Sequence, residues 1–420
     1  MVAASLSRPA AAPAWSQALL QALPAPAGVL APVQQRGRDA LAALPLPSRR
    51  DEAWRFTPLE VLTALDPSLL TLGAEPPVSL PAAASGTVRL VLDGRGDPLA
   101  GVTLPEGLSP LSEAELQQRL GQTLEANGCR EAWPVLLNKA AAGQLLALRV
   151  QGPVQPVLEL VCDAGGEACL LPVRILLVLE AGASLAVLQV HRSRGANLSS
   201  VVVEAQLGEG ARLQHGLLAH GHSEAALLAH LAVCQEPGSE LSLSSATAGW
   251  GLLRFEPRVQ QAGGQAQTTL RALQLVSGHQ LADTHSQVAF EGPEGRLDQL
   301  HKVVAGDAGR SVFNGAVRVP RAAQRTDASQ LSRSLLLSER ARVDTKPELE
   351  IVADDVRCAH GATVSQLQQD ELFYLQSRGI GADRAAALLL RGYCEEILRS
   401  LPSAAAAWQP LPTLLGETTD

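Results

Sequence analysis

A cysteine and a histidine two residues apart are the side chains of this chain best placed to do chemistry. Cys358 and His360 follow a β-type run that begins at Val352, just before the sequence becomes helical. Alternate residues of a strand point to the same face, so a strand through this segment places the thiol and the imidazole side by side. A sulfur ligand beside an imidazole suits iron, copper or zinc better than magnesium or calcium. The pair therefore predicts a transition-metal site, with a buried structural thiol as the alternative for Cys358.

Two other groups of candidate ligands are weaker. His220 and His222, with His215 and His230, have the composition of a metal site. Histidines in an irregular strand region are more often hydrogen-bonded or solvent-facing, however, and short motifs match by chance. The adjacent carboxylates Asp354-Asp355 would face opposite sides of a strand, so they do not form a pair of acid and base groups acting on one substrate.

The elements that must position Cys358 and His360 fall into three zones. Residues 1–145 are predicted to form a mostly helical N-terminal domain, in which Thr57-Pro58-Leu59-Glu60 predicts a helix start with Thr57 as the N-cap. Residues 146–362 consist of short β-type runs separated by Gly, Pro and acidic residues. Residues 363–420 are predicted to form a C-terminal helical domain with leucines on one stripe.

A recurring glycine turn suggests how the β-type runs are arranged. Gly182, Gly210 and Gly238 each precede a leucine by three residues and are 28 residues apart, with weaker copies at Gly263 and Gly309. Regularly spaced turns between short strands are typical of a β-solenoid, in which each coil buries its inner face against its neighbours. An antiparallel sandwich is the competing fold, because hairpins also leave turn signals at short spacing.

Composition excludes several classes of function. The net charge is −8 with dispersed basic residues, and aromatic residues make up 3% of the chain. Neither property suits nucleic acid, and we expect no such partner. No apolar run reaches the roughly 18 residues that a membrane span requires, and we see no secretory signal. We therefore expect a cytoplasmic chain with no membrane partner. Its six scattered cysteines are expected to be free thiols.

The segment around Cys358 and His360 also carries a family resemblance. The pattern KPxLEIxADDVxCxHGAT, followed by LFYLxSRGI, resembles the C-terminal signature of the SufB/SufD family of iron–sulfur cluster assembly scaffold proteins. Here it comprises Lys346, Pro347, Leu349 to Ile351, Ala353 to Val356, Cys358, His360 to Thr363, Leu372 to Leu375 and Ser377 to Ile380. Residues 309–338 and the anchor around Glu52, Trp54 and Arg55 resemble the family more sparsely. Ala359 and Gly361 stand where the SufB branch carries acidic residues, so the resemblance is to the SufD branch.

The resemblance implies a fold, a site and partners. The fold would be a right-handed parallel β-helix flanked by N-terminal and C-terminal helical domains. A transient iron–sulfur cluster would form at the interface with a SufB-like subunit, with His360 as the stronger candidate ligand and Cys358 as the second. A stable iron–sulfur cluster normally takes about four ligands, so another chain would complete the site. Whether a reduced flavin binds the complex, or the isolated chain forms a homodimer, is left open.

A second partner is implied at the C-terminal helices. In the family these helices are the expected docking surface for SufC, an ABC-type ATPase, and Phe373, Tyr374 and Arg378 are the residues we assign to it. The chain has no GxxxxGK[ST] motif, so ATP hydrolysis would belong to that partner and the chain itself would not be an enzyme. Two rival functions are a SufB-like primary scaffold, which the thin set of cysteines argues against, and a β-solenoid carbohydrate-active enzyme, which would need clustered carboxylates and stacking aromatics.

Overall fold

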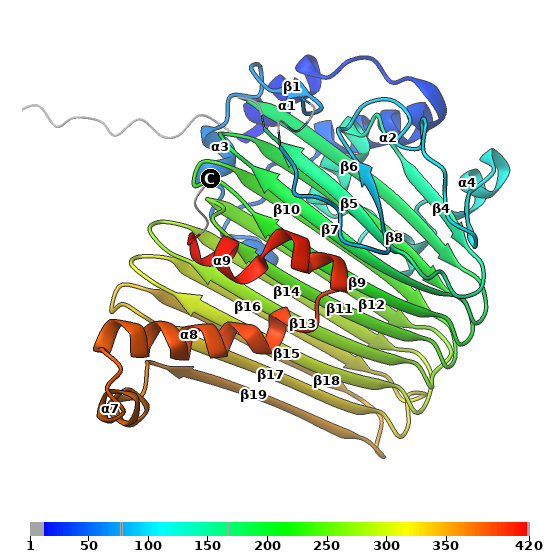
Figure 1. The fold of residues 1–420 in the computed structure, drawn as a ribbon. Helices are drawn as coiled ribbons and strands as arrows, with labels where there is room; N and C mark the ends of the chain where they lie inside the picture. Colours follow the sequence, from blue (N-terminus) through cyan, green and yellow to red (C-terminus); the bar gives the residue numbers. More distant parts are fainter. Residues whose placement is uncertain (1–11, 76, 78, 166–167, 418–420) are drawn as a thin grey trace, which may run out of the picture.

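The computed structural model describes residues 12–75, 77, 79–165 and 168–417. Its core is a parallel β-helix of about eight turns, in which successive strands alternate between two sheets (Figure 1). Each strand from β6 to β17 pairs in parallel with the strands two before and two after it, which excludes the antiparallel sandwich. The predicted β-solenoid between helical flanks is confirmed.

The two sheets have nine and ten strands. The nine-stranded sheet contains β2 Thr87–Val91, β5 Val157–Ala164, β7 Ser184–Ser193, β9 Arg212–His220, β11 Glu240–Ala248, β13 Gln267–Val276, β15 Arg296–Ala305, β17 Asp327–Leu336 and β19 Arg357–Ser365. The ten-stranded sheet contains β1 Thr71–Leu72, β3 Leu108–Pro110, β4 Leu146–Val150, β6 Cys169–Leu179, β8 Leu198–Leu207, β10 Ala226–Gln235, β12 Leu252–Gln261, β14 Leu281–Phe290, β16 Arg310–Val319 and β18 Arg342–Ile351.

The predicted glycine turns form one edge of the solenoid. Gly182, Gly210 and Gly238 have φ of 69°, 65° and 69°, a left-handed conformation that glycine adopts without steric cost. At the next turn of this edge the left-handed glycine is Gly264, beside the predicted Gly263. Gly309, by contrast, lies at the opposite edge, between β15 and β16. The predicted turn repeat is therefore correct at Gly182, Gly210 and Gly238, whereas Gly309 belongs to the series of turns at the opposite edge.

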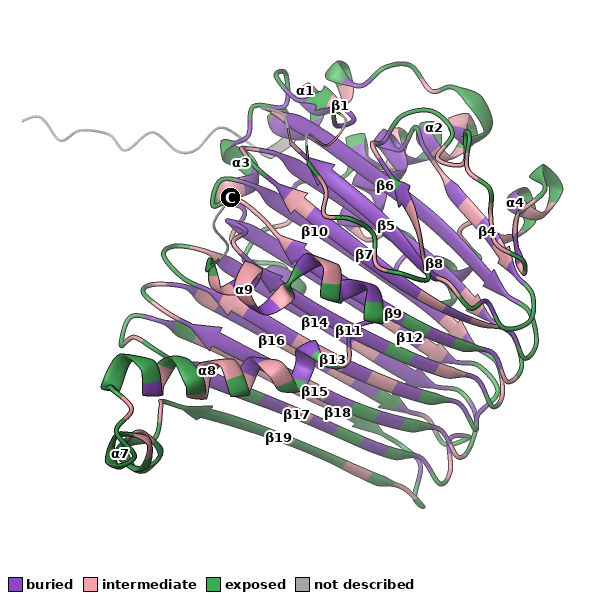
Figure 2. Cartoon of the chain, viewed as in Figure 1, coloured by how far each residue is buried: buried purple, intermediate pink, exposed green. Residues whose placement is uncertain are grey.

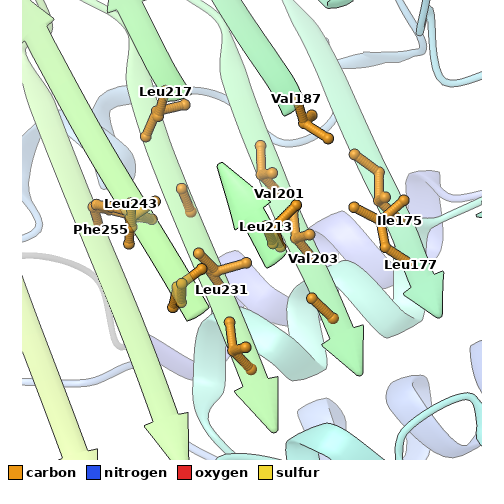
Figure 3. Packing of buried hydrophobic residues seen from close by; sticks show 14 of the residues in the cluster. Ile175, Leu177, Val187, Val201, Val203, Leu213, Leu217, Leu231, Leu243 and Phe255 are labelled. Carbon is orange, nitrogen blue, oxygen red and sulfur yellow. The ribbon is translucent and has the colours of Figure 1, made fainter. Parts of the chain in front are cut away.

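The inside of the solenoid changes in character along its axis. In the first coils it is filled by aliphatic side chains such as Ile175, Val203 and Leu231 (Figure 3). Towards the C-terminal end buried polar side chains such as Gln299, His301 and Gln330 take their place. The stability of the polar part depends on hydrogen bonds between its side chains, because a buried polar group without a partner lowers the stability of the fold.

Helices cover the two outer faces. The N-terminal set comprises α1 Ala12–Ala22, η1 Gly28–Leu30, α2 Ala31–Ala43, η2 Glu52–Trp54, α3 Glu60–Ala64, α4 Glu113–Arg119, α5 Gln122–Ala126 and α6 Trp133–Ala141. The C-terminal set comprises α7 Gln369–Ser377, α8 Ala382–Leu398, η3 Ser403–Trp408 and α9 Pro410–Leu415. Helices α5 and α6 pack on the ten-stranded sheet, whereas α8 and α9 cross the nine-stranded sheet (Figure 1).

The predicted helix start at Thr57 is wrong. Helix α3 begins at Glu60 with Leu59 as its N-cap, and no side chain caps it. The Thr57 hydroxyl instead donates a hydrogen bond to the carboxylate of Asp283 on β14. A long-range hydrogen bond to a buried carboxylate therefore replaces the expected local one.

Candidate functional site

Cys358 and His360 lie on β19, the last strand of the nine-stranded sheet. β19 pairs with β17 alone, in a register that sets Cys358 opposite Ala328 and His360 opposite Gln330. The predicted strand through both residues is present, so the thiol and the imidazole project to the same side. Ala328 and Gln330 are both buried inside the solenoid. In a parallel ladder paired residues point the same way, so Cys358 and His360 continue the inward-facing rows at the open end of the solenoid.

A line of amides leads up to His360 from inside the solenoid. Gln330 Nε2 donates to Gln299 Oε1 at 3.0 Å, and Gln299 Nε2 donates to Ser286 Oγ at 2.8 Å. The carbonyl oxygen of the Gln330 side chain is buried and has no hydrogen-bond partner among the described residues. His360 itself is exposed. The His360 imidazole thus lies at the open end of a polar interior. The Gln330 Oε1 atom on the neighbouring strand β17 is a hydrogen-bond acceptor that no described residue uses.

Cys358 has a different environment from His360. It is half-buried and packs against the main apolar core. Burial raises the pKa of the Cys358 thiol above its ordinary value, which favours the neutral thiol over the thiolate that binds metal. In the isolated chain His360 is therefore the more available ligand of the two.

The other candidate ligands do not come together. His215 lies inside the solenoid, where Nε2 is 2.7 Å from Gln189 Oε1, whereas His230 lies on the outer face of the other sheet. His222 is partly exposed and lies 3.7 Å from Glu224. Within the described ranges, no group of three or more His, Cys, Asp or Glu side chains is placed to hold a metal ion. All six cysteines are free, as predicted.

The end of the solenoid beside His360 is uncovered. β18 and β19 form the outermost edges of the two sheets, and nearly all of β19 is exposed (Figure 2). Charged residues and proline usually keep an edge strand from pairing with another chain. From Cys358 to Ser365 the strand has neither. Exposed apolar side chains line this end, namely Ile351, Val352 and Val364, of which the last two are 58% exposed. Its unused backbone groups can accept another strand.

A second uncovered surface lies just after β19. Helix α7 contains no buried residue and packs beside α8 (Figures 1 and 2). Phe373 and Tyr374 are 70% and 57% exposed, and the guanidinium carbon of Arg378 lies 5.3 Å from the centre of the Tyr374 ring. Adjacent exposed aromatic side chains with a neighbouring arginine are the composition of interface hot spots.

The family that matches this chain is described as "SUF system FeS cluster assembly, SufBD core domain", and the match covers residues 163–393. The chain belongs to the SufBD family. The matched region runs from the first coils of the β-helix through β19 and α7 into α8, so it includes Cys358 and His360.

Three curated relatives match over most of their length. A SufBD family iron–sulfur cluster assembly protein of Synechocystis is 32% identical over 408 residues, which is 90% of this chain and 88% of the relative. The chloroplastic protein ABCI7 of Arabidopsis thaliana is 31% identical, over 91% and 85% of the two chains. The iron–sulfur cluster assembly protein SufD of Escherichia coli is 29% identical, over 88% and 89%. No helix in the described part of this SufBD protein is long and apolar enough to cross a bilayer.

Two features of this SufBD protein were not found from the sequence as parts of a site. Gln330 appeared only within the family pattern, and its place beneath His360 follows from pairing between strands 30 residues apart. The second feature is Trp54, which packs in the apolar cluster of the N-terminal helices and also lies against the outer face of β12, with the Arg254 guanidinium carbon 3.9 Å from the centre of its ring. Apart from the family pattern, the sequence signal for Gln330 was the alternation of polar residues at i and i+2 in the last strands.

Proposed function

We propose that this chain is a SufD-like scaffold subunit that pairs with a SufB-like subunit, and that nascent iron–sulfur clusters form at the shared interface. The observation that carries the proposal is the placement of His360 on an edge strand that has no charged residue from Cys358 to Ser365 and whose outer edge is not paired with another described strand. A strand of the partner added to β19 would lie directly beside His360. The iron–sulfur cluster is the cargo of this site rather than a resident cofactor.

The ligand chemistry supports a shared site. Cys358 and His360 supply at most two ligands, whereas an iron–sulfur cluster normally takes about four. Ligands from the partner chain, a thiolate among them, would supply the others. A neutral imidazole releases iron more readily than a full set of thiolates would, which suits a scaffold that passes its iron–sulfur cluster to apo-proteins.

We assign the second uncovered surface to a SufC-like ATPase. Phe373, Tyr374 and Arg378 on α7 would contact that partner, whose ATP hydrolysis would then act on the nearby interface. β19 leads into α7 through only three residues, 366–368, so a displacement of α7 is transmitted to the strand that carries His360. The chain itself acts as an assembly subunit, without a catalytic group of its own.

The test is anaerobic loading with iron and sulfide of the chain alone, and then with SufB-like and SufC-like partners. Wild type, His360→Ala and the matched control His279→Ala, an exposed histidine in the turn after β13, are compared. We expect acid-labile sulfide and iron to be retained only in the complex, and retention to fall with His360→Ala but not with His279→Ala. Stable loading of the isolated chain that is indifferent to His360 would contradict the proposal and favour a SufB-like primary scaffold.

A further inference from the structure

A cationic cavity lies far from His360, between the N-terminal helices and the outer face of the ten-stranded sheet. It has a volume of about 340 Å³. Four cationic side chains line it: Arg36 on α2, Arg130 before α6, Lys139 on α6 and Arg174 on β6. The first turn of α5 closes one side. Five strands of the sheet separate β6 from the outermost strand β18, so the cavity belongs to the opposite end of the solenoid from β19.

Lys139 is buried without a counter-charge. The residue is 8% exposed, and its Nζ donates to the backbone carbonyl of Arg130 at 2.6 Å. Within the described ranges no carboxylate lies within 4.0 Å of it. Burial lowers the pKa of Lys139 to about 8, because the charged ammonium loses its hydration. An amine in this setting gains from any anion that enters the cavity.

Close helix packing keeps Lys139 in place. A Cβ atom added to Gly37 of α2 would lie 2.6 Å from the Cβ of Lys139, so the two helices touch at this glycine. The neighbouring Asn138 donates to the carbonyls of Val173 and Ser200 at 3.0 and 2.9 Å, which ties α6 to the sheet. The Lys139 side chain therefore starts from a rigid position, and little ordering entropy is lost when it binds a ligand.

Arg174 provides a second buried donor. Its side chain is 1% exposed, and Nη2 donates to Glu204 Oε1 at 2.7 Å. Nη1 donates to Asn138 Oδ1 at 3.5 Å, and the third guanidinium nitrogen, Nε, is buried and has no hydrogen-bond partner among the described residues. Glu204 is itself engaged by the backbone N–H of Gly121 at 2.9 Å, so it is not available to Lys139.

The remaining charges do not cancel the positive excess. Arg130 is paired with Glu125 and lies 3.7 Å from Glu131 at the rim. Arg36 is exposed and has no ion-pair partner within the described part of the chain. After the Arg130–Glu125 and Arg174–Glu204 pairs are removed, the cations Lys139 and Arg36 face the single rim carboxylate of Glu131, so one net positive charge remains.

We propose that this cavity binds a small phosphate-bearing anion, held by Lys139 and Arg174 in its interior and by Arg36 at its mouth. The donors converge from three different elements, α2, α6 and β6, which matches the divergent oxygens of a phosphate better than the planar fork of a carboxylate. The volume leaves room for an organic group that carries the phosphate.

Isothermal titration calorimetry on the full-length protein, with inorganic phosphate, pyrophosphate and succinate as probes, tests the proposal. Lys139→Met is compared with Lys346→Met, the same replacement at a partly exposed lysine outside the cavity that pairs with Glu52 and Glu348. We expect saturable phosphate or pyrophosphate binding that Lys139→Met weakens about 10- to 100-fold and Lys346→Met leaves unchanged. The midpoint of thermal unfolding of Lys139→Met should equal or exceed that of wild type, because the variant removes a buried charge that has no partner.

Three results would overturn the proposal. The first is that the wild-type protein binds neither phosphate nor pyrophosphate saturably. The second is that it binds succinate instead of these two probes, and the third is that Lys139→Met has the same phosphate affinity as wild type. Tighter binding of pyrophosphate than of phosphate would support a ligand that carries a diphosphate, and equal binding a ligand with a single phosphate. None of these measurements depends on iron–sulfur cluster assembly.

Discussion

Gln330 lies directly opposite His360 in the ladder between β17 and β19, and the carbonyl oxygen of its side chain is buried with no hydrogen-bond partner in the described part of the chain. Histidines that bind metal usually donate their second ring N–H to an oxygen acceptor, which fixes the tautomer that presents a lone pair to the metal. Gln330 is placed to supply that acceptor from inside the solenoid. It would then be a positioning residue for the proposed site, with no direct contact to iron.

The first prediction concerns this pair. Gln330→Leu should lower the iron affinity of the assembled complex about 10-fold or more, because His360 loses the acceptor that orients it. Iron retention against a competing chelator measures the change, and Gln117→Leu, an exposed glutamine on α4, is the control. Unchanged retention in a Gln330→Leu complex that still assembles would rule out the positioning role.

The second prediction concerns the network that attaches the N-terminal segment to the sheet. Arg254 has a 1% exposed side chain and donates to Glu256 at 2.7 Å and to Asp283 at 2.5 Å. Arg254→Met would remove the buried cation that both carboxylates share and leave Glu256 with Arg258 and Asp283 with His285, so it should lower the free energy of unfolding by about 3–5 kcal/mol. Denaturant unfolding measures this loss. The matched variant Arg318→Met breaks an exposed pair with Glu350 and should cost at most ~1 kcal/mol; equal losses would contradict the argument.

The third prediction is acid sensitivity caused by buried histidines. Burial lowers the pKa of His215 and His230 to about 4, and that of His191 and His301 to about 3, from 6.5 in the unfolded chain. The unfolded chain therefore takes up protons first as pH falls. Stability should be fully present above pH 6.5 and should decline as pH falls towards 4, by up to ~1.4 kcal/mol per pH unit for each histidine.

Urea unfolding from pH ~7.5 down to ~4.5 measures this slope. The range begins above the unfolded histidine pKa and stops at roughly the ordinary carboxyl pKa, where carboxylates begin to titrate as well. His301→Leu should make the slope shallower, because its buried imidazole, which stacks on Phe313 at 4.3 Å between ring centres, no longer titrates on unfolding. A stability that is flat with pH across this range would show that these histidines are already protonated or exposed in the folded protein.

The fourth prediction concerns the uncovered edge. Val364→Lys places a charge on β19, where the side chain is 58% exposed, and charged residues on an edge strand oppose strand addition. We expect folding to be unaffected and association with a SufB-like subunit to be lost in size-exclusion chromatography with light scattering. Val29→Lys, at a 50% exposed position in η1, is the control. A complex that forms normally with Val364→Lys would place the partner elsewhere.

The fifth prediction concerns α7. Phe373→Ala should weaken binding of a SufC-like ATPase by about tenfold or more, because exposed aromatic side chains carry much of the energy of an interface. Leu69→Ala removes a similarly exposed side chain, 65% exposed, far from α7 and should have no effect. Surface plasmon resonance with the immobilised ATPase distinguishes the two. Equal affinities for wild type and Phe373→Ala would remove α7 from the proposed docking surface.

Local patterns in the sequence were sufficient for the repeating architecture. Gly182, Gly210 and Gly238 predicted the turns, because only a residue without a Cβ adopts a left-handed φ at no steric cost. The spacing of Cys358 and His360 predicted that they share one face of a strand, because the alternation of side chains is a property of every extended backbone. Both inferences depend on neighbours within a few residues.

Only the tertiary structure decided which groups meet. Thr57 was predicted to cap its own helix, but it donates to Asp283, 226 residues away; a buried carboxylate that needs donors outweighs a local cap. The position of Gln330 beneath His360 depends on the register between β17 and β19, and the exposure of β19 depends on its being the last coil. Strand pairing joins residues about 30 positions apart through backbone hydrogen bonds, which carry no residue identity, so the sequence predicts the repeat but not these particular neighbours.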